Sequence, residues 1–451
     1  MPGDKIEESK EIEKLRRENE RLRKENEVLR KAKEKIEKEY EQYKVRHPES
    51  VGIKHGKPYF IKNSTKKRKG KKAGAGIGHK PSNRKKPIEI DETISYSIKE
   101  CPYCHNPELS EVQEIRERTV EDIPECKPIV TKCLIERRFC KVCGRLVESK
   151  EIPALPRAKI GLRAMLAVTW MKFSLRMTEE AIPKLMWELF KFRISEGGVI
   201  RVLDQVAKAF EPYYNELIKE IRGASVRHMD ETSWRILGDN AWLWAFLSNA
   251  TELYIIEKKR DHTIPLGVIG AGATGVNVHD RHSLYRTLSR KTKGTSDQDC
   301  WAHILGDSKE LSQFYGDEGA FIHRTLKRVH KKALKFHHKG TKADVDDLIS
   351  DLVQELVRPY KSIRCHRFVM NLLKGKDRLF TFVTNPVVDS TNNRAERGLR
   401  HSVIARKISG GSRSEKGARV YGKLTSVVRT LQIRDKNIVS EGPTILSTSH
   451  G

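Results

Sequence analysis

A change in the spacing of apolar residues near Val226 constrains the fold more than any other feature of this chain. From there apolar and polar residues alternate, as they do in β-strands, along runs at 226–236, 241–247 and 253–259. Short turns separate these runs, so they predict an antiparallel meander. A fourth run ends at Asp280, and a fifth short strand or a helix start follows Gln298. With interleaved helices, this order predicts a multidomain α/β protein with a ribonuclease-H-like core.

Three acidic residues lie where such a core would hold metal ions. Asp230 lies in the first strand, Asp280 ends the fourth, and Glu396 lies in a helix that begins near Thr391. Carboxylate oxygens select Mg²⁺ or Mn²⁺, and two such ions beside a phosphodiester support phosphoryl transfer. The alternative is that each acid is an ordinary surface or capping residue, as most acids are.

The helix that carries Glu396 adds polar and basic side chains. Asn392 lies four residues before Glu396 and therefore on the same helical face. Arg397 and Arg400 flank that face and suit contacts to phosphate groups. Just upstream, Asp389 and Ser390 are expected to cap the helix.

A Cys-x-x-His motif, Cys300 to His303, follows the fourth strand. It has the spacing of half a zinc site, but no second half lies near it in the sequence. We therefore expect both side chains to pack or to support the acids rather than to bind metal.

The formal net charge of +28 favours a polyanionic partner over mere solubility. The longest apolar stretches, such as 241–247, are too short to cross a bilayer, so nucleic acid is expected rather than a membrane. The chain starts with charged residues instead of an apolar signal sequence. We expect a cytoplasmic, nucleoid-associated protein whose cysteines are thiols or metal ligands.

The first hundred residues combine a heptad repeat with a basic stretch. Leucine, isoleucine and tyrosine recur every seventh residue from Leu15 to Tyr43, which predicts a coiled coil over 1–45 and a homodimer or higher oligomer. A single solvated helix is the alternative. Residues 46–98 read as a flexible basic linker. Its basic run is expected to contact DNA phosphates through Lys66, Lys67, Arg68 and Lys69.

Two Cys-x-x-Cys pairs predict a zinc-binding domain over 99–150. The pairs are Cys101 with Cys104, and Cys140 with Cys143. Two thiolates from each pair complete a tetrahedral Zn²⁺ site, with strands expected at 112–120 and 129–139. A redox motif is the rival interpretation, but it needs one pair and not two.

The other segments follow from helical and strand patterns. Residues 151–224 predict helices with a helix-turn-helix-like connection. The core is expected to span 225–316 and 379–435, interrupted by a helical insertion at 317–378, and residues 436–451 form a tail. The helix beginning near Thr391 is expected to be the final one.

The chain resembles DDE transposases of the insertion-sequence-66 family over nearly its whole length. The resemblance includes Gly78-His79-Lys80 and the paired cysteine motifs. The most specific matches are His228-Met229-Asp230-Glu231-Thr232, Cys300-Trp301-Ala302-His303, Thr391-Asn392-Asn393-Arg394-Ala395-Glu396-Arg397 and Arg406-Lys407-Ile408-Ser409-Gly410-Gly411-Ser412-Arg413-Ser414.

The resemblance implies that Asp230, Asp280 and Glu396 are the catalytic triad and bind magnesium, and we expect Arg406 and Lys407 to contact DNA. It implies that the partner is double-stranded DNA, with binding of terminal inverted repeats, hydrolytic cleavage and transfer of the 3′ ends into target DNA. Two alternatives stay open: a catalytically inactive zinc-ribbon DNA-binding protein, and a structure-selective nuclease of the same fold.

Overall fold

The computed structural model describes residues 20, 27, 87–148, 154–156, 158–337 and 339–448. The chain divides into two units, Met1–Val120 and Glu121–Gly451. The predicted coiled coil, apart from Glu20 and Glu27, and the basic run at 66–69 lie outside the described residues.

A five-stranded mixed sheet forms the centre of the second unit. Its strands are β3 (Val226–Ile236), β4 (Asp239–Leu247), β5 (Glu252–Glu257), β6 (Gly275–His279) and β7 (Thr295–Asp299), in the order β5-β4-β3-β6-β7. The pairs β3–β4 and β4–β5 are antiparallel, whereas β3–β6 and β6–β7 are parallel. The mixed α/β architecture, the meander and the fourth strand are confirmed.

Local sequence explains how the strands begin and turn. The β3–β4 hairpin turns at Leu237 and Gly238, which both have positive φ (53° and 89°), as a two-residue turn that follows strand twist requires. In β4 most residues from Ala241 to Leu247 are buried, which suits a strand covered on both faces. In contrast, β7 is made of polar residues, and three of them are buried through internal hydrogen bonds.

Helices connect the parallel strands and cover the sheet. Between strands lie α6 (Thr263–Ile269) and α7 (Ser283–Lys291). After β7 come α8 (Trp301–Phe314), α9 (Gly316–Phe336), α10 (Lys342–Leu356), α11 (Ile363–Leu373), the short 3₁₀-helix η2 (Lys376–Arg378) and α12 (Thr381–Thr384). The segment 317–375 is therefore mainly helical, as predicted, and it packs around its own apolar core with residues from β6.

The chain returns to the sheet with α13 (Asn393–Ser409), α14 (Glu415–Ile433) and α15 (Ile438–Thr448). The prediction that the helix near Thr391 is the last one is wrong, because two more helices follow it. Helix α14 packs closely on β5: a Cβ added at Gly422 would lie 2.9 Å from the Tyr254 carbonyl oxygen. Small residues on α14 therefore allow this close approach.

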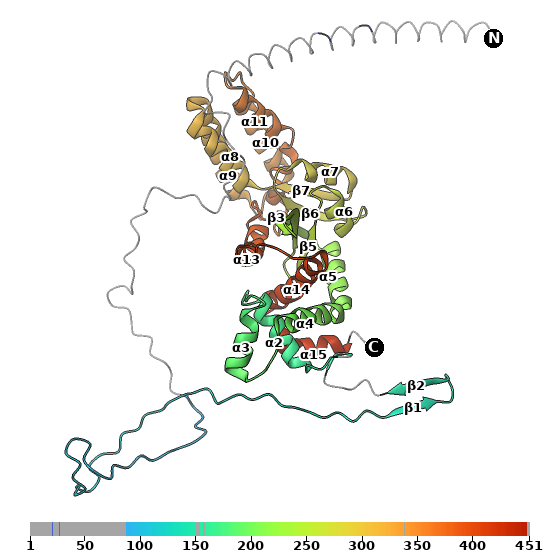
Figure 1. Ribbon diagram of the computed structural model, residues 1–451. Coiled ribbons are helices and arrows are strands. Elements are labelled where there is room, and N and C mark those ends of the chain that lie inside the picture. Colours follow the sequence, from blue (N-terminus) through green and yellow to red (C-terminus); the bar gives the residue numbers. More distant parts are fainter. Residues whose placement is uncertain are drawn as a thin grey trace. The chain divides into compact units, whose positions relative to one another are not determined.

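The helical segment before the sheet is also present. It contains α2 (Leu162–Phe173), α3 (Ala181–Phe190), α4 (Glu196–Ala209) and α5 (Glu211–Gly223). These helices share one apolar core with α14, α15 and side chains of β3 to β5. In Figure 1, α2 to α5 lie with α14 and α15 near β5, whereas α8 to α11 lie beyond β7.

Among the described residues 105–148, the only strands are β1 (Arg137–Cys140) and β2 (Arg145–Glu148), which form a hairpin. The strand predicted at 112–120 is wrong, and of the strand predicted at 129–139 only the last residues form β1. Val112, Ile115 and Val120 are exposed, so no packed neighbour stabilises an extended pair there.

Candidate active site

The parallel pairing of β3 with β6 sets Asp230 and Asp280 side by side. The register aligns His228 with Val278, and each acid lies two residues further along its strand direction. Residues in equivalent positions on neighbouring parallel strands share one edge of the sheet. Both acids are half-buried there. The side chain of Asp230 accepts the Glu231 N–H and that of Asp280 accepts the His282 N–H, each at 2.9 Å.

Asn392 joins the first turn of α13 to this edge. Its side-chain amide donates to the Met229 carbonyl (2.8 Å), its side-chain oxygen lies 3.2 Å from His228 Nδ1, and its backbone N–H donates to Cys300 Sγ (3.1 Å). Asn392 is fully buried, so these bonds fix the start of the helix beside Asp230. Glu396, one turn later, is thereby directed toward the same edge.

The expected capping by Asp389 and Ser390 is wrong. The N-cap residue of α13 is Asn392, and no side-chain oxygen caps the helix. Ser390 Oγ lies 3.3 Å from His330 Nε2, and Asp389 lies 3.9 Å from His228 Nε2. Both residues are used in tertiary contacts, which outweigh the local capping preference.

Cys300 and His303 also reach the edge. The Cys300 N–H donates to the His279 carbonyl (2.9 Å), which places the start of α8 next to Asp280. His303 Nε2 lies 3.8 Å from Glu396 Oε1. Interaction with Cys300, opposed by burial and assisted by Asp280 and Glu396, raises the pKa of His303 to about 9. Sequence reasoning expected only packing or support from these two residues, because the contact to Glu396 bridges distant segments.

The three acids are only weakly neutralised by cationic side chains: Glu396 has His303 at 3.8 Å. Burial, followed by the charges of Glu231 and Asp280, raises the pKa of Asp230 well above its ordinary value. In the described part of the chain, no lysine or arginine forms an ion pair with Asp230, Asp280 or Glu396. Acids that repel one another at an open edge can be relieved by cations.

Glu231 is a buried acid that sequence reasoning did not single out. Tyr285 on α7 donates to one carboxylate oxygen (2.6 Å) and Arg260 donates to the other (2.9 Å). Arg260 also lies over the Trp242 ring, 4.3 Å from its centroid. Burial, with Asp280 next in strength, raises the pKa of Glu231, while Tyr285 and Arg260 act in the opposite direction. The adjacent acids of β3 therefore have different environments.

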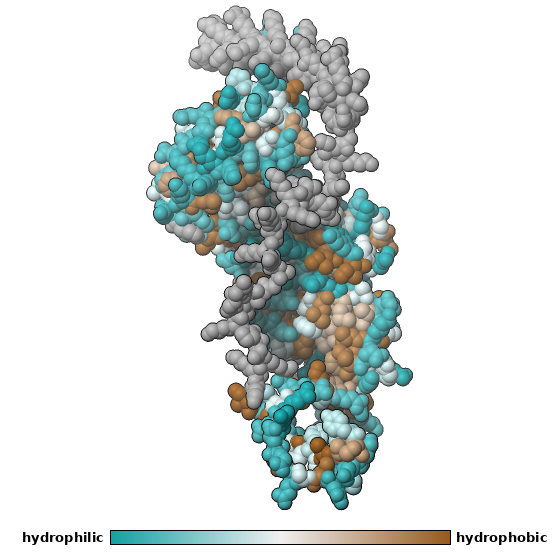
Figure 2. All heavy atoms as spheres, turned by 90° about the vertical axis from the view of Figure 1, so that its left-hand side faces the viewer, coloured by the Kyte–Doolittle hydropathy of each residue, from teal (hydrophilic) through white to brown (hydrophobic). Residues whose placement is uncertain are grey.

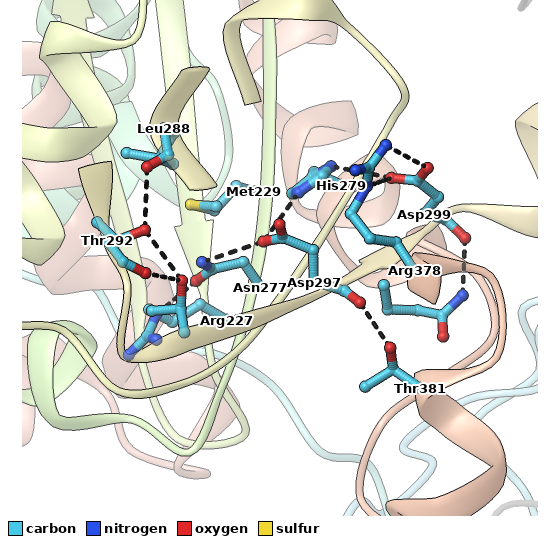
Figure 3. Close-up of polar contacts among 12 residues, drawn as sticks. Arg227, Met229, Asn277, His279, Leu288, Thr292, Asp297, Asp299, Arg378 and Thr381 are labelled. Atoms are coloured by element: carbon cyan, nitrogen blue, oxygen red, sulfur yellow. Dashed lines mark hydrogen bonds and ion pairs between the residues drawn. The ribbon is translucent and has the colours of Figure 1, made fainter. Parts of the chain in front are cut away.

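A polar network, which we call the floor, lies beside this edge within the parallel part of the sheet (Figure 3). Its members are Arg227, Asn277, His279, Asp297, Asp299 and Arg378. His279 Nε2 lies 3.3 Å from Asp297 Oδ1, and its ring stacks on Tyr285. Burial lowers the pKa of His279, but the ion pair with Asp297 and the charge of nearby acids outweigh it and raise this pKa to about 9.

The predicted DNA-contacting residues near Glu396 fall into two groups. Arg397, Arg400 and Lys407 are exposed on α13. Arg406 is half-buried and donates to the Thr232 and Ser233 side chains and to the Ser233 carbonyl. Arg406 thus ties α13 to β3 in the described structure.

Each cysteine pair forms a tight turn of its own. At Cys101, backbone N–H groups of Tyr103 and Cys104 lower the pKa of the thiol, and those of Cys143 and Val142 do so at Cys140. Thiolates that accept backbone N–H groups in this way are suited to Zn²⁺. The two pairs belong to different units of the chain.

The sequence model of the Transposase IS66 family matches residues 160–420, which is more than half of the chain. The chain belongs to the IS66 transposase family. No curated protein matches it significantly. The matched span includes all three acids, Cys300 and His303, and it ends within α14. Membership makes the chain a transposase, whose substrate is DNA.

Among the described residues, no helix is both long and apolar enough to cross a membrane.

Proposed function

We propose that this transposase cleaves the ends of its insertion sequence by two-metal phosphodiester hydrolysis and transfers the 3′ ends into target DNA. The observation that most supports the proposal is that Asp230 lies on β3, that Asp280 directly follows its parallel neighbour β6, and that His303 interacts with both Asp280 and Glu396, with no lysine or arginine partner for the acids among the described residues. Carboxylates gathered in this way are suited to binding divalent cations.

The sheet supports a ribonuclease-H-like core. Three antiparallel strands are followed by two parallel ones in the order β5-β4-β3-β6-β7. The first acid lies on the central strand, the second follows its parallel neighbour, and the third comes from a helix after the helical insertion. This is the arrangement that the acids' order along the chain predicts.

Asp230, Asp280 and Glu396 would hold Mg²⁺ or Mn²⁺, because all three offer hard carboxylate oxygens. When bound, such ions activate the attacking oxygen and stabilise the leaving oxygen of a phosphodiester. The raised pKa of Asp230 implies that its carboxylate ionises reluctantly without a cation. Metal affinity should therefore stay weak until DNA adds phosphate oxygens.

The surrounding residues orient these acids. Asn392 fixes α13 against β3, and Arg406 adds a second tie further along the helix. Glu231, held by Arg260 and Tyr285, stays away from the metal-binding role because both of its oxygens are already engaged. The floor would fix the part of β3 that precedes Asp230 and the end of β6 that precedes Asp280.

Exposed basic residues supply contacts to DNA phosphates. On α13 these are Arg397, Arg400 and Lys407. Helix α9 exposes Arg324, Lys327, Arg328, Lys331 and Lys335, and the surface over α8 and α9 is mainly hydrophilic (Figure 2). DNA affinity should therefore fall steeply with salt.

The amino-terminal segments would add recognition and assembly. We infer that Cys101, Cys104, Cys140 and Cys143 hold one Zn²⁺, supported by the N–H···S turns at both pairs. The helices of 151–224 would help to bind terminal inverted repeats, Lys66, Lys67, Arg68 and Lys69 would contact phosphates, and the coiled coil over 1–45 would form a homodimer. These proposals are supported by sequence patterns.

A Mg²⁺-dependent cleavage assay on DNA that carries the element's own terminal repeats tests the proposal. Cleavage by the unmodified chain, lost in Asp230→Asn and Glu396→Gln with DNA binding retained, would support it. Joining of cut ends to target DNA would distinguish a transposase from a nuclease. Binding without cleavage by the unmodified chain would instead indicate an inactive DNA-binding protein.

A further inference from the structure

One mixed group of side chains beside the acids has donors that magnesium does not need. The ligand atoms of Cys300, His303 and Glu396 all lie within 4.8 Å of one another. A thiol and an imidazole are soft or borderline ligands, and they suit Zn²⁺ better than Mg²⁺.

The geometry of this cluster is close to that of a bound ion. Zinc bonds to sulfur, nitrogen and oxygen place tetrahedral ligand atoms roughly 3.3–3.6 Å apart. His303 Nε2 and Glu396 Oε1 are separated by 3.8 Å, so a small side-chain movement suffices. The three residues come from the start of α8 and the first turn of α13, which Asn392 joins rigidly.

Two further observations, one on Cys300 and one on His303, point to a ligand. Cys300 is fully buried, and its sulfur accepts the Asn392 N–H at 3.1 Å, which holds the sulfur at the start of α13 near Glu396. His303 Nδ1 is buried and has no hydrogen-bond partner in the part of the chain that the structure describes. A buried ring nitrogen without a partner is unfavourable unless a metal or its hydrogen-bonding shell engages the imidazole.

We propose that Cys300, His303 and Glu396 form a site for a thiophilic divalent cation, Zn²⁺ foremost, separate from the four-cysteine site. The remaining position would take water or a DNA phosphate. The geometry of the three side chains supports the cation site whether or not the proposed function holds. Because Glu396 belongs to both sets of ligands, bound zinc would withhold it from magnesium and inhibit cleavage, a consequence that rests on the proposed function.

Cobalt(II) titration of the full chain, without DNA or magnesium, tests the site. The near-ultraviolet absorption of cobalt–thiolate bonds and the visible bands of tetrahedral cobalt report binding. A site with one sulfur should absorb at shorter visible wavelengths than a four-cysteine site, so the two classes can be separated. Cys300→Ser keeps a hydrogen-bond acceptor for Asn392 but loses the thiolate, and His303→Gln changes a partly exposed side chain. Cys365→Ser is the matched control, because Cys365 is a buried thiol on α11 outside the cluster.

The proposal predicts that the short-wavelength class is lost in Cys300→Ser and His303→Gln and kept in Cys365→Ser. Its retention in a folded His303→Gln or Cys300→Ser variant, as judged by thermal unfolding, would overturn the proposal. Absence of this class from the unmodified chain would overturn it too. Asp230→Asn should keep the cobalt class while losing cleavage, so that failure of this site and failure of the proposed function give different results.

Discussion

The acids of the floor and the acids at the neighbouring edge of the sheet differ in how completely cationic side chains neutralise them. Asp297 and Asp299 in the floor are almost completely buried, and each has a histidine or arginine within ion-pair distance. Asp230, Asp280 and Glu396 at the edge are half-buried; Glu396 has His303 at 3.8 Å, and none of the three has an arginine or lysine partner in the described chain. The protein thus pairs the acids that hold the strands together, whereas Asp230 and Asp280 have no ion-pair partner among the described residues.

This difference predicts that the floor acids contribute to stability and the edge acids to function. Buried charges persist only when they are paired, so the floor should contribute stability that is sensitive to the loss of any partner. Acids that repel one another at a functional edge should instead lower stability when no metal is bound. Three substitutions test the two halves of this comparison.

The largest expected effect is at Arg227 in the floor. This fully buried arginine donates to the Asn277 side chain and to the carbonyls of Arg222, Ala224 and Thr274. Arg227→Met removes the donors while keeping the length of the side chain. We expect the free energy of unfolding in urea to fall by about 3–5 kcal/mol, because several buried acceptors lose their donor at once and each costs about 1–3 kcal/mol.

Arg235→Met is the matched control, because Arg235 is exposed on the same strand and its side chain donates to the nearby Gly238 carbonyl, its one side-chain hydrogen bond among the described residues. This variant should stay within about 0.5 kcal/mol of the unmodified protein. Equal stability of the two variants would show that the floor does not hold the strands.

His279 gives the floor a defined pH dependence. Its pKa in the folded protein is about 9, raised by Asp297 against the effect of burial, from an ordinary 6.5. The stabilisation is complete below about pH 6.5 and is lost as pH rises through about 9, on the order of 3 kcal/mol in all. Unfolding measured across this interval should show the decline, and His279→Gln should reduce it.

His366→Gln, on the exposed face of α11, is the control and should leave the slope unchanged. An unaltered slope in His279→Gln would mean that the His279–Asp297 pair is not charged in the folded protein.

The smallest expected effect is on the acids at the edge. Here the substitution should raise the free energy of unfolding instead of lowering it. Asp230→Asn removes a carboxylate whose pKa is raised by burial and by neighbouring acids. We expect the metal-free protein at neutral pH to become more stable, on the order of 1 kcal/mol as for other stabilising substitutions. Asp239→Asn, at an exposed strand start, should not change the melting temperature. A less stable Asp230→Asn protein would contradict the repulsion described at this edge.

A strand or helix could be predicted from the sequence where its apolar pattern matches the surfaces on which it packs. Alternation in β3, β4 and β5 located these strands because one or both faces meet an apolar core. Strand β7 has no apolar residue, so its position was only bracketed. Residues 112–120 have the alternation of apolar and polar residues typical of a strand, but among the described residues they pair with no neighbouring strand. Helix α14 follows α13 so closely that the single helix start near Thr391 concealed it.

Candidate site residues could be picked out from the sequence where each lies in a recognisable strand or helix pattern. Asp230, Asp280 and Glu396 stand out because each follows a strand or helix pattern. The support around them was not accessible in the same way: Asn392 contacts β3, Glu231 is held by Tyr285, and His303 meets Glu396 only after folding. Contacts between segments far apart in the chain leave no local signature.

The most direct test of the unneutralised acids is a calorimetric titration of Mn²⁺ into the full chain bound to terminal-repeat DNA, comparing Asp280→Asn with Asp307→Asn. Asp307 is the matched control, because it is an exposed acid that is already paired with Arg281. The arrangement at the edge predicts at least about tenfold weaker Mn²⁺ binding, or about 1.4 kcal/mol, in Asp280→Asn and no change in Asp307→Asn. Equal Mn²⁺ affinity in Asp280→Asn and the unmodified chain would contradict the assignment of this edge as the metal-binding site.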